Sequence, residues 1–152
     1  MIEININKTL GEFHLNMEVK SESKRIGILG ASGCGKSMTL KCIAGIETPD
    51  KGKIILEDRI LYDKEQKINV KPQKRKIGYL FQNYALFPTM SVRKNIMAGL
   101  KCRREEQKQI ADRMIARFQL DGLGDRLPRE LSGGQQQRAA LARIMAYEPD
   151  VI

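Results

Sequence analysis

The sequence predicts an α/β protein whose strands and first helix form a core and whose later part is a helical subdomain inserted into it. Three observations predict this class. Apolar and polar residues alternate strictly over 2–6 and 13–19, as in half-buried strands joined by a hairpin. A short apolar run over 25–29, typical of a strand buried on both faces, leads through glycines into a helical pattern over 36–46. From residue 91 onward, apolar residues recur with a helical period.

The remaining elements follow from the same patterns. Ser91 is expected to cap a helix, because its hydroxyl can accept a hydrogen bond from the first helical turn. Glycine and proline mark the turns between elements. In chain order, we expect a turn at 49–52, strands over 53–56 and 77–81, helices over 91–100 and 104–118, a loop over 121–130 and a helix over 134–146.

Composition excludes several classes of protein. The chain has no run of about 18 apolar residues, and its N-terminus lacks the pattern of a signal peptide. Its three cysteines are widely spaced and fit no zinc motif, which is typical of reduced thiols in the cytoplasm. The net charge is +9, but only 5% of the residues are aromatic, so we expect anionic ligands rather than a nucleic acid.

One segment carries the complete G-x-x-x-x-G-K-[ST] pattern of a nucleotide phosphate loop, after an apolar run and before a helix. Glycines let backbone N–H groups surround an anion, and the helix start adds its positive dipole end. Lys36 is the expected catalytic cation on the β- and γ-phosphates of ATP, and the Ser37 hydroxyl is an expected Mg²⁺ ligand. A glycine turn with a solvated lysine is the alternative. The expected nucleotide-binding residues are Gly30, Ala31, Ser32, Gly33, Cys34, Gly35, Lys36, Ser37 and Met38.

A second motif, LSGGQ over 131–135 with Arg138 following, resembles the signature sequence of ABC transporter ATPases. The resemblance implies that the signature closes on the γ-phosphate bound by a partner subunit, in a homodimer with two nucleotides sandwiched head to tail. A capped helix start is the alternative, which explains the serine but not the two glycines and the glutamine. The signature residues expected to bind nucleotide are Ser132, Gly133, Gly134 and Gln135.

Between the two motifs, residues 78–83 resemble the Q-loop of the same family, and 85–96 resemble the segment that follows it in the importer branch. That branch includes molybdate, sulfate and maltose importers. The resemblance implies that Gln82 contacts Mg²⁺ and the attacking water, and couples the site to two membrane-spanning permease subunits. It also implies the P-loop NTPase fold of an ABC ATPase, a parallel sheet with N-terminal antiparallel strands. We expect one partial domain over 1–152, divided into a core (1–83), a helical subdomain (84–130) and the signature region (131–152).

The sequence departs from the family pattern in three places. It ends before the expected Walker B aspartate and catalytic glutamate, which Glu148 and Asp150 cannot replace. The family's switch histidine is also missing, because the only histidine is His14, near the N-terminus. We therefore expect an ATPase as the full-length subunit, but no hydrolysis by these 152 residues alone. Without the missing strands, the apolar faces of 26–29 and 77–81 would be exposed and the fragment poorly stable, rearranged or swapped with another copy. Leu10 stands where the family usually has an adenine-stacking aromatic, and Phe13 is the nearest aromatic residue.

The resemblance therefore favours the ATP-binding subunit of a bacterial importer for molybdate or a similar anion, located in the cytoplasm on the inner face of the membrane. Two alternatives stay open. The chain could be a non-hydrolysing nucleotide-binding or interaction module, or a soluble ABC ATPase that acts on nucleic acid. ATP turnover separates the first alternative from an importer ATPase, and nucleic-acid binding that weakens with salt would support the second.

Overall fold

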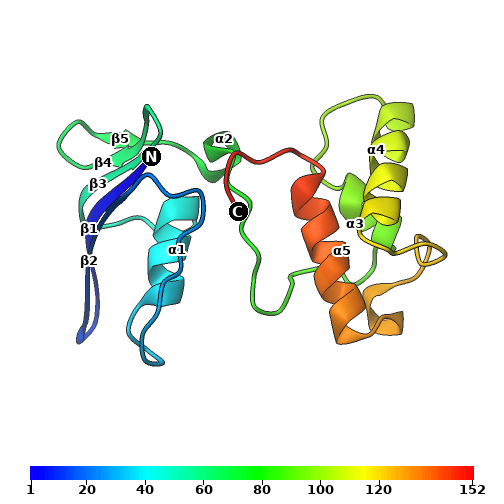
Figure 1. Ribbon diagram of the computed structural model, residues 1–152, viewed down its shortest axis with the longest axis horizontal. Helices are drawn as coiled ribbons and strands as arrows, with labels where there is room; N and C mark the ends of the chain where they lie inside the picture. Colours follow the sequence, from blue (N-terminus) through cyan, green and yellow to red (C-terminus); the bar gives the residue numbers. More distant parts are fainter. The chain divides into compact units, whose positions relative to one another are not determined.

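The computed structural model describes all 152 residues, which form two compact units, Met1–Lys76 and Ile77–Ile152 (Figure 1). The first unit is a small sheet with two helices, and the second is mainly helical. The first unit contains β1 (Ile2–Leu10), β2 (Phe13–Ser21), α1 (Lys36–Ala44), β3 (Lys51–Leu56), β4 (Arg59–Asp63), β5 (Ile68–Asn69) and α2 (Pro72–Arg75). The second contains α3 (Val92–Met97), α4 (Arg104–Arg117), the 3-10 turn η1 (Pro128–Glu130) and α5 (Gly133–Met145).

The sheet of the first unit is antiparallel, with the strand order β2-β1-β3-β4-β5. The predicted hairpin is confirmed: β1 and β2 pair along their whole length, and Leu10 faces Phe13 at the turn. Alternation places Ile4, Ile6 and Leu15 in the core, while the residues directly beside each of them in the strands are polar. The hairpin thus has one apolar face in the core, and β2 begins close to the glycine-rich loop that precedes α1.

Two predicted strands are not strands in the structure. Residues 25–29 have no regular structure, their backbone groups make no hydrogen bond, and the Leu29 side chain is 95% exposed. The predicted strand over 77–81 is reduced to one parallel bridge, in which the Gly78 N–H donates to the carbonyl of Val151 at 2.7 Å. A strand needs hydrogen-bonded neighbours along its length; residues 25–29 have none, and residues 77–81 have only this bridge. The expected exposure of their apolar faces is borne out at Ile26, Leu29 and Phe81.

The helices agree with the sequence patterns apart from their ends. The helix predicted over 36–46 stops at Ala44 because Gly45 adopts a left-handed conformation, with φ of 80°. The helix predicted over 91–100 ends at Met97, and Ser91 caps it as expected. The predicted loop over 121–130 ends in the short turn η1, and β4, β5 and α2 had no prediction.

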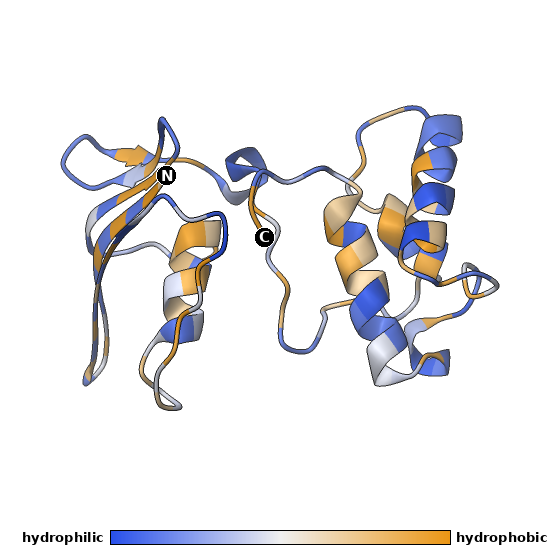
Figure 2. Ribbon diagram, viewed as in Figure 1, coloured by the Kyte–Doolittle hydropathy of each residue, from blue (hydrophilic) through white to orange (hydrophobic).

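A separate apolar core holds the second unit together. It joins Val92 and Ile96 of α3 to Ala111 and Ile115 of α4, and α5 contributes small alanines that allow close packing. Figure 2 shows the mixed colouring of α4 and α5 that is typical of helices with one buried face. No helix of the chain has the length and apolar character needed to cross a membrane.

Candidate nucleotide site

The phosphate loop ends in a helix start that no side chain caps. Gly33 and Gly35 have φ of 83° and 97°, a conformation that side-chain-bearing residues rarely adopt. The first helical hydrogen bond of α1 runs from the Thr39 N–H to the Gly35 carbonyl. The N–H groups of residues 35–38 therefore have no acceptor within the helix, and they lie where the positive end of the helix dipole attracts an anion.

Lys36 supplies the only full positive charge within the loop. Its amine donates to the carbonyls of Gly30 at 2.9 Å and Ala31 at 2.7 Å, so the side chain folds back across the loop. These carbonyls hold the ammonium group beside the open N–H groups. An arriving phosphate would be attracted by both the ammonium and the N–H groups.

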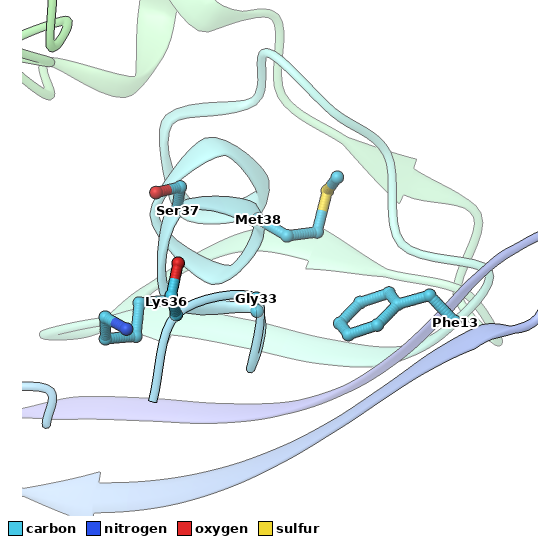
Figure 3. Close-up of a pocket in the computed structure, with 7 residues that line it drawn as sticks. Phe13, Gly33, Lys36, Ser37 and Met38 are labelled. Carbon is cyan, nitrogen blue, oxygen red and sulfur yellow. The ribbon is translucent and has the colours of Figure 1, made fainter. Parts of the chain in front are cut away.

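A cavity of about 380 Å³ adjoins this loop (Figure 3). Figure 3 shows the Phe13 ring pointing toward Gly33 and Met38, while Lys36 lies on the other side of Gly33. The cavity is thus apolar at one end and cationic at the other, as a nucleoside phosphate requires. It is lined by Phe13, Ser32, Gly33, Gly35, Lys36, Ser37 and Met38.

Strand β2 packs directly against the loop. A Cβ atom on Gly35 would lie 2.7 Å from Cδ1 of Leu15 and 3.0 Å from Cζ of Phe13. Phe13, rather than Leu10, therefore supplies the apolar wall of the cavity, a role that the sequence left open. The register of the hairpin could have identified Phe13 from the sequence, because Phe13 pairs with Leu10 and begins the strand that runs beneath the loop.

The signature motif forms the N-terminus of α5 in the second unit. The Ser132 hydroxyl accepts from the Gln135 N–H at 3.3 Å, and the Gln135 side-chain oxygen accepts from the Ser132 N–H at 2.8 Å. This reciprocal cap accounts for the glutamine as well as the serine, so the expectation that capping explains only the serine was wrong. A Cβ atom on Gly133 or Gly134 would meet nothing within 4 Å, so packing within this chain does not require either glycine.

Gln82 is exposed and begins a tight turn in the second unit. The turn places Tyr84 and Ala85 at positive φ, 61° and 44°. Arg143 of α5 holds this strained backbone, donating to the Ala85 carbonyl at 2.7 Å and the Tyr84 carbonyl at 3.1 Å, with its guanidinium 5.6 Å from the centre of the Phe87 ring. Burial lowers the pKa of Arg143. The helix that starts at the signature motif thus fixes the segment just after Gln82.

The next stretch of chain, residues 87–91, is held by one buried amide. Asn95 of α3 is fully buried, and its side-chain oxygen accepts from the Phe87 N–H at 2.8 Å. Its amide nitrogen donates to the carbonyls of Phe87, Met90 and Ser91 at 3.1, 2.9 and 3.1 Å. No sequence pattern distinguishes this asparagine from an exposed one, and it was not predicted.

The candidate Mg²⁺ ligands fit a cation that arrives with a nucleotide. Ser37 lies exposed on the first turn of α1, and Gln82 is exposed in the second unit; both offer uncharged oxygen donors. No cluster of three or more His, Cys, Asp or Glu side chains in the chain could hold a metal. Mg²⁺ bound with nucleotides usually takes one or two protein oxygens, and phosphates and water complete its shell. The hydroxyl of Ser37 suits that pattern.

Sequence comparison places these motifs in a known family. A profile described as ABC transporter matches residues 13–152. The chain is 41% identical over 155 residues to the sulfate/thiosulfate import ATP-binding protein CysA of Synechocystis sp., and covers 42% of that protein with 97% of its own length. It is 40% identical over 153 residues to the molybdenum import ATP-binding protein ModC of Haemophilus ducreyi, with 100% of this chain and 43% of that protein covered. The chain thus spans less than half the length of these two relatives.

Solved structures give the same result for the fold. A dimeric post-hydrolysis structure of the ATP-binding cassette MJ0796, bound to ADP and phosphate, superposes with a TM-score of 0.79 at 26% identity. The match covers 98% of this chain and 71% of that one. A second dimeric structure of MJ0796, a bacterial ABC transporter cassette, also has a TM-score of 0.79, at 27% identity.

Proposed function

Because this chain belongs to the ABC transporter family, we propose that it binds ATP with Mg²⁺ and serves as the ATP-binding subunit of an oxyanion importer. The observation that carries the proposal is the cavity at the phosphate loop, with Phe13 at its apolar end and Lys36 beside the uncapped start of α1. Such a cavity accommodates a flat base and a chain of phosphates at once.

The groups that line the cavity have distinct roles in this proposal. The N–H groups of residues 35–38 bind phosphate oxygens, and Lys36 exchanges its bonds to the loop carbonyls for the β- and γ-phosphates. The Ser37 hydroxyl would hold Mg²⁺, which neutralises phosphate charge when it is bound. The Phe13 ring lies against the base, where an aromatic face stacks on any purine.

The second unit acts on the partner and on the membrane. In a head-to-tail homodimer, the signature residues Ser132 to Gln135 would contact the γ-phosphate held by the other subunit. Gln82 would contact Mg²⁺ and the attacking water. Movement of its turn would be passed to two permease subunits, with the ATPase peripheral on the cytoplasmic side of the membrane.

The transported solute is proposed as a tetrahedral oxyanion, with molybdate the choice from the sequence. Relatives named for sulfate/thiosulfate import and for molybdenum import both support this chemical class. Uptake of labelled sulfate and molybdate by cells that lack the gene, with and without its re-expression, separates the two. If cells without the gene lose only sulfate uptake, sulfate replaces molybdate as the proposed solute. If they lose uptake of neither anion, the oxyanion proposal is refuted.

Nucleotide binding is tested with two lysines of one helix. Lys36→Ala removes the loop cation and should weaken ATP affinity by roughly 10- to 100-fold or abolish binding, since a charge-assisted bond contributes about 1.5–3 kcal/mol. Lys41→Ala removes a lysine from the last turn of α1, where no contact with the cavity occurs, and should change little. Equal affinities for the two variants in calorimetry would refute the site.

The role in trans is tested at the signature serine. Ser132→Asp keeps a good N-cap acceptor for α5 but adds a negative charge where a partner's phosphate is proposed to lie. The expected result is unchanged helix stability with loss of ATP-dependent dimers in light scattering. Ser132→Asn, an uncharged cap, is the matched control. If both variants dimerise with ATP, the serine has a capping role only.

The non-hydrolysing module is the second candidate. It shares the binding site, so Lys36→Ala weakens binding under either proposal. Only the full-length subunit is expected to hydrolyse ATP, so turnover is measured there: steady release of phosphate, abolished by Lys36→Ala, supports the importer ATPase. Tight binding without turnover supports the module.

A further inference from the structure

Arg75, the last residue of α2, is fully buried and yet has no carboxylate within ion-pair distance. Its guanidinium group donates hydrogen bonds to uncharged carbonyl and amide oxygens. A buried cation without a counter-charge is costly unless its hydrogen bonds are complete. Burial accordingly lowers the pKa of Arg75.

The guanidinium is directed at the C-terminal end of α1. One terminal nitrogen, Nη1, donates to the carbonyl of Cys42 at 2.8 Å and to that of Ile43 at 2.7 Å. These carbonyls lie in the last turn of α1, where helix carbonyls lack internal donors and the dipole is negative. Gly45 lies directly against the guanidinium, since a Cβ there would be 2.6 Å from Nε.

The other guanidinium nitrogens tie this helix end to the loop that follows β5. Nε donates to the carbonyl of Val70 at 2.8 Å, and Nη2 donates to the side-chain oxygen of Asn69 at 3.0 Å. The opposite end of the same nine-residue helix begins at the phosphate loop. A helix this short is a stiff rod of about 13 Å, so tilting its C-terminal end moves the N–H groups at its start.

We propose that Arg75 is a positioning residue for nucleotide binding: by anchoring the far end of α1, it aims the helix start and Lys36 at the phosphates. The inference rests on the proposed ATP site. In metal sites, outer residues that orient the direct ligands typically change affinity by roughly 10- to 100-fold when they are replaced. We expect a loss of this size for Arg75→Met, with a smaller loss for Arg75→Lys, which keeps the charge but not the fork of donors.

The test measures ATP affinity by calorimetry in the full chain, below the melting temperature of each variant. Arg59→Met is the matched control, because it also removes an arginine that donates to backbone carbonyls of this region, those of Lys74 and Arg75. It should loosen α2 and keep ATP affinity within about threefold. If Arg75 has a purely structural role, Arg75→Met and Arg59→Met should lower the melting temperature equally, and Arg75→Met should show no additional loss of ATP affinity.

The outcomes are distinct. If the wild-type protein binds no ATP, the proposed function fails and this inference fails with it. If the wild type binds and Arg75→Met binds equally well, or if Arg59→Met is weakened as much, only the role of Arg75 is overturned. If Arg75→Met does not fold, Arg75→Lys decides: weakened affinity in a folded protein supports positioning, and wild-type affinity overturns it.

Discussion

Replacing Asn95 by Asp tests how the second unit holds the chain after Gln82. The substitution changes one atom of similar size and keeps the oxygen that accepts from the Phe87 N–H. It replaces the amide donor, which faces three carbonyls at 2.9–3.1 Å, by an oxygen that repels them. The side chain is fully buried, so water cannot compensate.

The size of the effect follows from this geometry. The lost amide bonds cost about 1 kcal/mol or more net, and burial raises a carboxyl pKa by roughly 3 units, or about 4 kcal/mol at pH 7. Because the folded pKa is raised above the ordinary value near 4, the folded state binds the extra proton. Stability is therefore lost as pH rises from about 4 toward the raised pKa. We expect about 5 kcal/mol of destabilisation at pH 7, and about 1–2 kcal/mol near pH 4.

Hydrogen–deuterium exchange measures this directly. Amides of α3 and the segment 87–91 should exchange faster in Asn95→Asp at pH 7, with β1 and β2 as internal references from the other unit. Asn83→Asp makes the same change of charge at an exposed position and should have little effect. A loss of protection that is independent of pH, or none at all, would refute the reasoning.

Three further predictions concern the first unit. Gly52→Ala places a Cβ 1.9 Å from the Asn5 carbonyl oxygen and should destabilise by about 3 kcal/mol or more in thermal unfolding. Gly11→Ala, also at positive φ but in open space, should cost about 1 kcal/mol, so equal shifts would contradict the clash. Burial raises the pKa of Cys42 to about 11, so the stability that the thiol contributes is complete below pH 9 and is lost as pH rises through 11. In urea unfolding, Cys42→Ala should lose less stability than the wild type over this pH range. If stability falls in parallel with pH in the two proteins, this prediction is refuted. Gly35→Ala should weaken ATP affinity through its contacts with Leu15 and Phe13, whereas Gly27→Ala, in open space, should leave calorimetric affinity unchanged.

The parts of the fold that sequence predicted well are those whose pattern is local. Alternation predicted the β1–β2 hairpin, and the helical pattern predicted α1 except for its C-terminal end, which Gly45 sets two residues earlier. The run over 25–29 was predicted as a strand because its residues are apolar, but apolar character says nothing about whether a neighbouring strand is present. Leu29 is exposed for that reason.

The residues that sequence could not identify are polar groups whose role depends on burial. Arg75 lies in a basic run that looks solvated, and the lysines on either side of it, Lys74 and Lys76, are exposed while it is buried. Asn95 has no pattern at all. In both cases the side chain satisfies backbone groups that are distant in sequence or lie in an irregular loop, as with Arg75 and the carbonyls of Cys42 and Ile43. Periodicity describes faces of elements, so it carries no information about such partners.

Under the proposed function, the two glycine motifs bind phosphate in different ways, because their helix starts are capped differently. At α1 no side chain caps the helix, so the N–H groups of residues 35–38 are all open to a ligand. At α5 the side chain of Ser132 already occupies the N–H of Gln135, and the first helical bond is donated by Gln136. Only the N–H groups of Gly133 and Gly134 stay open there, beside the Ser132 hydroxyl. In the proposed dimer, the uncapped start therefore holds a nucleotide by itself, whereas the capped start adds two donors to a phosphate already bound by a partner.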